Sequence, residues 1–150
     1  MREILFRAKR ADKDEWIYGT PFQEYSDFWG EWEWKIQTKH PLTNVPFLHL
    51  SVEKNTFGQF TGLTDKNGKK IFEGDIVHIL GNQDVEDWKN VDYNALIAFI
   101  DGGFCAIDGT VEEHGFRRYA LARLDFSLEV IGNIHDNPEL LGGEEDGNTV

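Results

Sequence analysis

The chain has 150 residues, of which 40% are hydrophobic, 28% charged and 13% aromatic, and its formal net charge is −12. These values are typical of a soluble globular protein with one modest core, and the acidic surface disfavours general affinity for nucleic acid. The single cysteine excludes an internal disulfide, and no apolar run approaches the ~20 residues of a membrane span. The charged N-terminus lacks the apolar region of a signal peptide, so we expect a cytoplasmic protein with no membrane partner.

The first third of the chain predicts short antiparallel strands. Trp32, Trp34 and Ile36 alternate with charged residues, and this period of two is typical of a strand with one apolar face. Two prolines within residues 41–46 indicate a loop. The predicted strands cover residues 4–8, 16–19, 31–36 and 47–52, and a charged turn at residues 12–14 joins the first two.

Residues 59–77 predict a tight hairpin and, directly after it, a second turn. Asn67-Gly68 is a strong hairpin signal, because a type I′ turn needs positive φ at both central residues. Gly74 and Asp75 form the second turn, where we expect Asp75 to accept backbone N–H bonds as in an Asx turn. We assign all four residues structural roles.

The second half of the chain continues as strands separated by turns. Asp101-Gly102-Gly103 predicts a tight turn, and the polar residues 81–90 and 108–118 predict surface loops. Asn137 before Pro138 predicts the start of a short helix, since Asn caps helices and Pro suits the first helical position. The predicted strands cover residues 76–80, 94–100, 104–107, 121–124 and 128–134.

Four stretches of the sequence resemble the YopX family, small proteins of bacteriophages and integrated prophages. They read MREILFRAKR at the N-terminus, WIYG at residues 16–19, QFTGLTDKNGKKIFEGDIV at residues 59–77 and EVIGNIHDNPELL at residues 129–141. They occur in the family's order and at both ends of the chain. The resemblance implies a mainly β fold and a phage setting in a bacterial host, and it carries over no site residues.

Short strands at regular spacing predict a mainly β fold, a small SH3-like, partly open barrel of about five strands. We expect additional N-terminal strands and a short C-terminal helix beside this barrel. The predicted domain spans residues 1–141, with the N-terminal strands at 1–55 as a lid and the barrel at 56–141. Residues 142–150 are acidic and polar and predict a disordered tail.

The residue types that carry catalysis or bind metals are scattered. The histidines show no metal-binding spacing, and Cys105 stands between apolar neighbours, which indicates a buried thiol. Glu112-Glu113 beside His114 resembles an acid–base cluster, but its polar setting favours a solvated surface. We therefore expect no catalytic residues, no metal and no cofactor.

An aromatic stretch is the best functional lead from the residues themselves. One interpretation is that these side chains fill the core, and the other is a protein–protein patch that includes Trp29, Trp32 and Trp34. Base stacking is disfavoured, because the interleaved residues are acidic rather than basic. The stretch consists of Tyr25, Phe28, Trp29, Trp32 and Trp34.

Two binding functions from different classes stand foremost, and a third function, an enzyme, would need carboxylates that converge only in the folded chain. The first is a non-enzymatic phage accessory protein that binds another protein, with self-association as a homo-oligomer through exposed strand edges as a further expectation. The alternative is a nucleic-acid-binding module on an SH3-like barrel. It would need basic side chains to gather on one face, namely Arg2, Arg7, Lys9, Arg10, Arg117 and Arg118.

Overall fold

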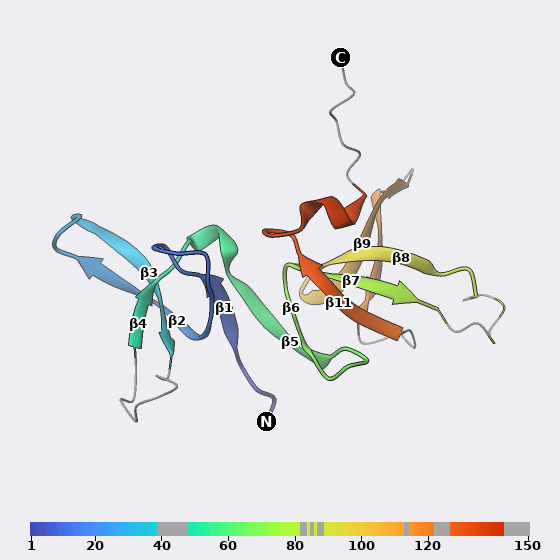
Figure 1. Ribbon diagram of the computed structural model, residues 1–150, viewed down its shortest axis with the longest axis horizontal. Coiled ribbons are helices and arrows are strands. Elements are labelled where there is room, and N and C mark those ends of the chain that lie inside the picture. The colour runs from blue at the N-terminus through green and yellow to red at the C-terminus, as the bar shows by residue number, and fades with distance from the viewer. Residues whose placement is uncertain are drawn as a thin grey trace, which may run out of the picture. The chain divides into compact units, whose positions relative to one another are not determined.

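The computed structural model describes residues 1–38, 48–81, 84, 86, 89–112, 115–121 and 127–142, with the backbone alone over 109–112 and 115–120 (Figure 1). The described chain is mainly β, as predicted, and consists of antiparallel sheets, with short 3-10 turns that include residues 54–56 and 138–141. It divides into two compact units, Met1–Gly62 and Leu63–Val150. The predicted single domain over residues 1–141 stays a prediction.

The first unit is built on an antiparallel sheet with the strand order β4-β3-β2-β1-β5. Its core consists of Ala8, Ile17, Ile36 and Val52, each less than 9% exposed. The predicted hairpin between residues 4–8 and 16–19 is confirmed, since Phe6 pairs with Gly19 and Lys9 with Trp16. The strands are β1 (Phe6–Lys9), β2 (Trp16–Ser26), β3 (Glu31–Thr38), β4 (Leu48–Ser51) and β5 (Gly58–Thr64).

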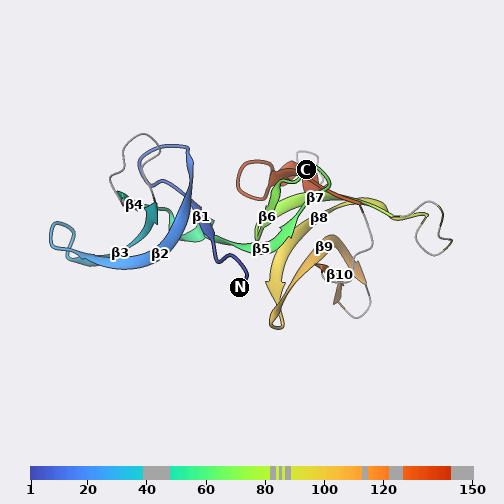
Figure 2. The same cartoon turned by 90° about the horizontal axis from the view of Figure 1, so that it is seen from below.

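The second unit holds a five-stranded antiparallel sheet in the order β10-β9-β8-β7-β11. Figure 2 shows this sheet curving from β7 through β9 to β10. Its core includes Ile71, Val77, Ile79 and Ile97, all at most 1% exposed. The strands are β7 (Asp75–Leu80), β8 (Asp92–Ile100), β9 (Gly103–Glu112), β10 (Gly115–Ala120) and β11 (Ser127–Asn133), and the short β6 (Lys70–Phe72) precedes them.

The SH3-like barrel is not confirmed. In the described part of the second unit, β10 and β11 are the outermost strands of an open sheet and do not pair with each other. The polar residues 108–118 are not a loop: β9 and β10 pair there, with Val111 opposite Phe116. Strand pairing overrides composition in this segment, because β-propensity depends on the neighbouring strand more than on the residue itself.

The Asn-Gly hairpin forms, but its turn is not type I′. Gly68 has φ +81°, whereas Asn67 is not among the residues with positive φ. The N–H of Gly68 donates to the Asp65 carbonyl at 3.0 Å, the pattern of a three-residue connection with glycine in the left-handed position. Both central residues have positive φ in the two-residue Asp101-Gly102 turn between β8 and β9, as a type I′ turn requires.

The carboxylate of Asp65 explains this turn. Its Oδ1 accepts the backbone N–H groups of Asn67 and Lys69, both at 2.9 Å, which fixes the loop from inside. Its Oδ2 accepts the N–H of Val130 on β11 at 3.0 Å. The N–H of Lys66 donates to the Leu128 carbonyl at 2.9 Å, so the loop also covers the outer edge of β11.

The second turn is held by Asp75 and Gly74. Asp75 is 1% exposed, and its Oδ2 accepts the N–H of Phe72 at 2.8 Å. The predicted acceptance of a backbone N–H is therefore confirmed, although the donor precedes Asp75 instead of following it. Gly74 has φ +88° and links β8 to the turn after β11, because its N–H donates to the Ile97 carbonyl and its carbonyl accepts the N–H of Ile134.

The C-terminal segment is a single 3-10 turn, η3 (Pro138–Leu141), and the predicted short C-terminal helix is not confirmed. Asn137 makes no side-chain cap bond to it, and Gly142 ends it with φ +65°. Instead, a Cβ at Gly132 would lie 2.6 Å from Oδ1 of Asn137, so that glycine makes room for the Asn137 side chain. The Leu140 carbonyl accepts the amide of Asn94 at 2.8 Å, which ties η3 to β8.

Several predictions lie outside the described residues. These are the loop at 41–46, residues 122–124 of a predicted strand, Glu113 and His114 of the acid–base cluster, the side chains of Glu112, Arg117 and Arg118, and the tail from residue 143 onward.

The Asp65 carboxylate predicts a pH-dependent stability. Burial alone would raise the pKa of Asp65, but the N–H donors of Val130, Lys69 and Asn67 outweigh it and lower the pKa. The stabilisation is therefore complete above the unfolded-state pKa of about 4 and is lost as the pH falls through the lower native pKa. Asp65→Asn replaces one acceptor oxygen by a donor and should cost about 1–3 kcal/mol at neutral pH.

Urea unfolding of the wild type and of Asp65→Asn, from neutral to acidic pH, measures this cost. The difference between their free energies of unfolding should narrow as the pH falls. Asp27→Asn, at an exposed carboxylate, is the matched control and should leave stability unchanged. A difference in the free energy of unfolding that does not vary with pH would contradict the stabilising role assigned to the Asp65 carboxylate.

Candidate functional site

The β2–β3 hairpin is the most distinctive surface of the first unit. Tyr25 lies directly opposite Trp32, and Ser26 lies opposite Glu31. The turn between them is closed by the N–H of Gly30, which donates to the Ser26 carbonyl at 2.7 Å. Gly30 has φ +70°, a conformation that glycine adopts without strain.

The register separates the side chains of this ribbon into two faces. Opposite residues share a face and successive residues alternate, so Trp34, Trp32 and Tyr25 lie on one side. Trp34 is half-buried, meets Phe57 edge-on at 5.3 Å between ring centroids and packs against the core of the unit. Trp32 meets Tyr25 edge-on at 5.6 Å. The aromatic face therefore begins at the core and continues out along the ribbon.

Beyond Trp34 the aromatic side chains are exposed. Trp32 is 63% exposed, Trp29 is 66% exposed and Phe28 is 83% exposed. Phe28 and Trp29 contact each other edge-on with centroids 4.6 Å apart in the turn. Large contiguous apolar patches on a protein surface mark binding sites. We call Tyr25, Phe28, Trp29 and Trp32 the aromatic tip, at the end of the β2–β3 hairpin in Figure 1.

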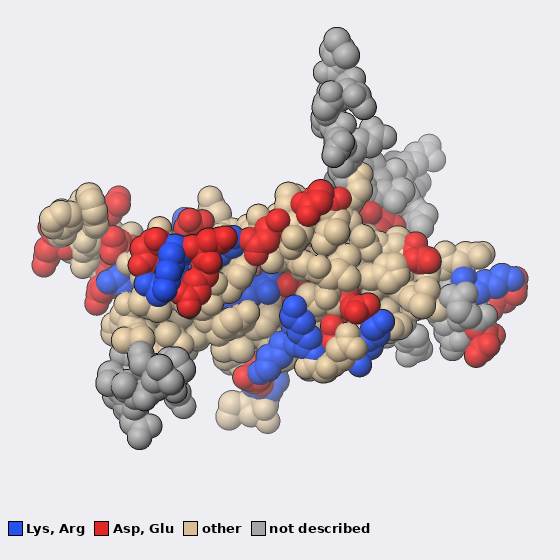
Figure 3. All heavy atoms as spheres, viewed as in Figure 1, with Lys and Arg blue, Asp and Glu red and all other residues tan. Residues whose placement is uncertain are grey.

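The opposite face of the hairpin is acidic. Glu24 and Glu33 lie directly opposite each other, and Lys35 forms an ion pair with Glu24 and lies 4.0 Å from Glu33. The hydrogen bond from Lys35 lowers the pKa of Glu24. Asp27 lies in the turn and Glu31 directly follows it; both are exposed and have no ion pair within the described residues. In Figure 3, Asp and Glu side chains surround the uncharged end of this hairpin.

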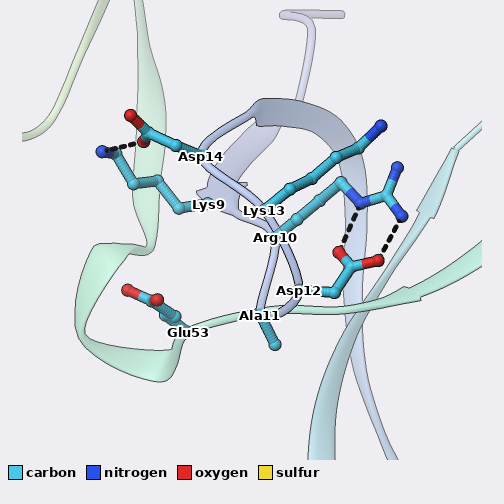
Figure 4. A pocket seen from close by; sticks show the side chains of 7 residues that line it. All are labelled: Lys9, Arg10, Ala11, Asp12, Lys13, Asp14 and Glu53. Atoms are coloured by element: carbon cyan, nitrogen blue, oxygen red, sulfur yellow. Dashed lines mark hydrogen bonds and ion pairs between the residues drawn. The ribbon is translucent and has the colours of Figure 1, made fainter.

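The basic residues of the N-terminus form a different kind of site. A pocket of about 290 Å³ lies at the β1–β2 turn, lined by Lys9, Arg10, Ala11, Asp12, Lys13, Asp14 and Glu53 (Figure 4). Arg10 binds both oxygens of Asp12, at 2.8 and 2.7 Å, and Lys9 binds Asp14 at 2.6 Å. The hydrogen bond from Arg10 lowers the pKa of Asp12. The cations of this pocket are therefore neutralised by their own neighbours.

Among the histidines that the structure describes, His78 comes closest to an acid–base arrangement. Its Nε2 lies 3.2 Å from a carboxylate oxygen of Asp92, and its Nδ1 lies 3.0 Å from the side-chain oxygen of Asn94. Both ring nitrogens are occupied, which suits a link between β7 and β8. No group of three metal-ligating side chains occurs in the parts of the chain that the structure describes. Cys105 is 6% exposed, so its thiol is buried as predicted.

The three tryptophans of the predicted partner surface differ in how far the structure buries them. Trp29 and Trp32 lie on the surface, and Trp34 lies at the edge of the core. Sequence reasoning missed Asp65, although an aspartate two residues before Asn-Gly is a signal for a side-chain-capped turn.

Comparison with known proteins identifies the family. The family model described as "YopX protein" matches residues 5–142. The chain belongs to the YopX family. The match to the family model confirms the resemblance seen in the four sequence stretches. A search of curated proteins finds no match.

Solved crystal structures are also similar to this chain. The crystal structure of YopX from Bacillus subtilis is 20% identical, with a TM-score of 0.51 over 91% of this chain and 96% of that one, and it shows a shared fold. The crystal structure of protein EF1440 from Enterococcus faecalis is 25% identical, with a TM-score of 0.47 over 94% of this chain and 99% of that one. The described residues of this YopX-family chain include no helix long and apolar enough to cross a membrane.

The difference in burial between Trp34 and Trp32 predicts different costs of truncation. Trp34→Ala removes a ring that packs on Phe57 and the core and should lower the free energy of unfolding by about 1–3 kcal/mol. Trp32→Ala removes a ring that is 63% exposed and should cost less than about 1 kcal/mol. Urea unfolding followed by circular dichroism compares the two variants, and equal losses would contradict this division of the aromatic face.

Proposed function

We propose that this YopX-family chain is a non-enzymatic accessory protein of a phage or prophage that acts in the bacterial cytoplasm by binding another protein. The aromatic tip is the contact surface. The observation that carries the proposal is the exposure of Phe28, Trp29 and Trp32, each more than 60% exposed on a hairpin anchored in the core by Trp34.

The size of the aromatic tip is appropriate for the centre of an interface. A buried aromatic side chain contributes 150–250 Å², so four partly exposed ones offer on the order of 400–500 Å². A standard interface uses about 800 Å² per partner, with the binding energy concentrated in Trp, Tyr and Arg. The aromatic tip can therefore supply the central contacts, and the acidic side chains around it can form the polar rim.

The surroundings of the titratable side chains support a binding role over catalysis. Asp65 and Asp75 are buried and accept backbone N–H groups, and both ring nitrogens of His78 face other side chains. These groups stabilise turns and strand pairs. A catalytic role would require at least one of them to face a substrate.

The alternative, a nucleic-acid-binding module, requires cations available to phosphates. Arg7 is 6% exposed with its guanidinium 4.6 Å from the centre of the Trp16 ring, and Lys9 and Arg10 pair with carboxylates. This pairing weighs against phosphate binding and favours the protein-binding proposal. Self-association stays a separate prediction, with β4 and β10 among the outermost strands of their sheets.

Capture from a bacterial lysate tests the proposal. Tagged protein is incubated with nuclease-treated lysate at physiological salt, and the retained proteins are identified by mass spectrometry. The wild type should retain at least one protein, and the double variant Trp29→Ala/Trp32→Ala should retain at least about tenfold less of it, because interface aromatics dominate binding.

The matched control is Phe99→Ala, which removes a 52% exposed aromatic from the second unit and should retain the protein normally. Capture that is unaffected by the double variant, or no retained protein at all, would count against the proposal.

A further inference from the structure

The chain itself shows how a tryptophan and a carboxylate together hold a cation. The Lys9 ammonium lies 5.6 Å from the centre of the Trp16 ring and 2.6 Å from the Asp14 carboxylate. The Arg7 guanidinium lies over the same ring at 4.6 Å. A cation over a tryptophan face is attracted by the ring quadrupole, and a neighbouring carboxylate adds a charge-assisted bond.

Carboxylates also neighbour the rings of the aromatic tip along the chain, without a cation among them. Trp29 and Trp32 are exposed, Asp27 lies in the turn beside Phe28, and Glu31, opposite Ser26 on the acidic face, directly precedes Trp32 in the chain. Residues 21–34 contain no Lys or Arg. Lys35, the first cation after them, is engaged with Glu24 on the acidic face. In the described part of the chain, the cations that lie over a tryptophan are those at Trp16.

We infer that the aromatic tip binds a lysine- and arginine-rich segment of another protein, whose cations lie over Trp29 and Trp32 and pair with Asp27 and Glu31. This inference rests on the proposed function and names the chemistry of its partner. The aliphatic parts of Lys and Arg side chains would cover the exposed rings while their charged ends meet the carboxylates. Arginine suits both contacts best, because its planar guanidinium stacks on aromatic rings and binds carboxylates in a bidentate manner.

Charge also argues against other occupants of the same surface. A second copy of this hairpin would bring Asp27 and Glu31 against the same carboxylates, and like charges in contact are unfavourable. Phosphate backbones and anionic lipid surfaces would be repelled in the same way. A basic protein segment satisfies both the aromatic rings and the acidic rim.

A display library of random linear peptides tests the inference on the full-length chain. Peptides are selected for binding to the wild type and depleted on Trp29→Ala/Trp32→Ala. The selected peptides should be enriched in Lys and Arg, and their affinity, measured by fluorescence anisotropy, should fall as salt rises. The double variant Asp27→Asn/Glu31→Gln should weaken binding by about tenfold, and Trp29→Ala/Trp32→Ala by more than that.

The control variant Glu139→Gln changes an exposed carboxylate of the second unit and should bind as the wild type does. Selection of neutral or acidic peptides, or no enrichment, would overturn the inference. Binding that depends on the tryptophans but not on Asp27 and Glu31 would overturn it and leave the proposed function intact. Lysate capture unaffected by Trp29→Ala/Trp32→Ala would remove the proposed function as well.

A second measurement distinguishes a lipid surface from a basic protein segment as the partner. Tryptophan fluorescence is recorded with vesicles of phosphatidylcholine alone and with added phosphatidylglycerol. The inference predicts no spectral shift with either vesicle, and a shift that is lost in Trp29→Ala/Trp32→Ala would overturn it in favour of a membrane surface.

Discussion

The pairing register of β2 with β3 is the constraint on which the candidate site depends. Because side chains alternate along a strand, placing Tyr25 opposite Trp32 also places Trp34 on the same face and Glu24 and Glu33 on the other. A slip of one residue would move the rings to the acidic face and the carboxylates toward the core. The packing of Trp34 on Phe57 fixes this register at the base of the hairpin. The exposed aromatic tip is thus a consequence of one anchored pair of strands.

The second unit shows a different use of polar residues. Asp65 and Asp75 are both less than 9% exposed, and their carboxylates accept backbone N–H groups at tight turns. Buried charges are tolerated only when they are well bonded, and Asp65 has three such donors. Residues 59–77, one of the four stretches that resemble the YopX family, therefore contain carboxylates that stabilise the second unit. The aromatic tip lies outside all four of the stretches that carry the resemblance.

The sequence predicted local features well and long-range ones poorly. Alternation located β3, and turn residues located the hairpins around Asn67-Gly68 and Asp101-Gly102, because both signals act over a few residues. The turn type at Asn67 was wrong, since it depends on the Asp65 carboxylate, which also bonds Val130 65 residues away. Alternation placed Trp32 and Trp34 on one face but did not predict how deeply each side chain is buried, because that depends on where Phe57 packs. The SH3-like barrel was not confirmed, because the order of strands in a sheet leaves little local signal.

Photo-crosslinking tests the central claim, that the aromatic tip is the contact surface, most directly. A benzophenone amino acid is placed at Phe28, which is 83% exposed, and in a second protein at Phe99, which is 52% exposed in the other unit. Both proteins are irradiated in the same bacterial lysate. The account predicts a covalent protein adduct from position 28 and none from position 99. Adducts from position 99 alone would place the contact surface on the second unit and contradict the account.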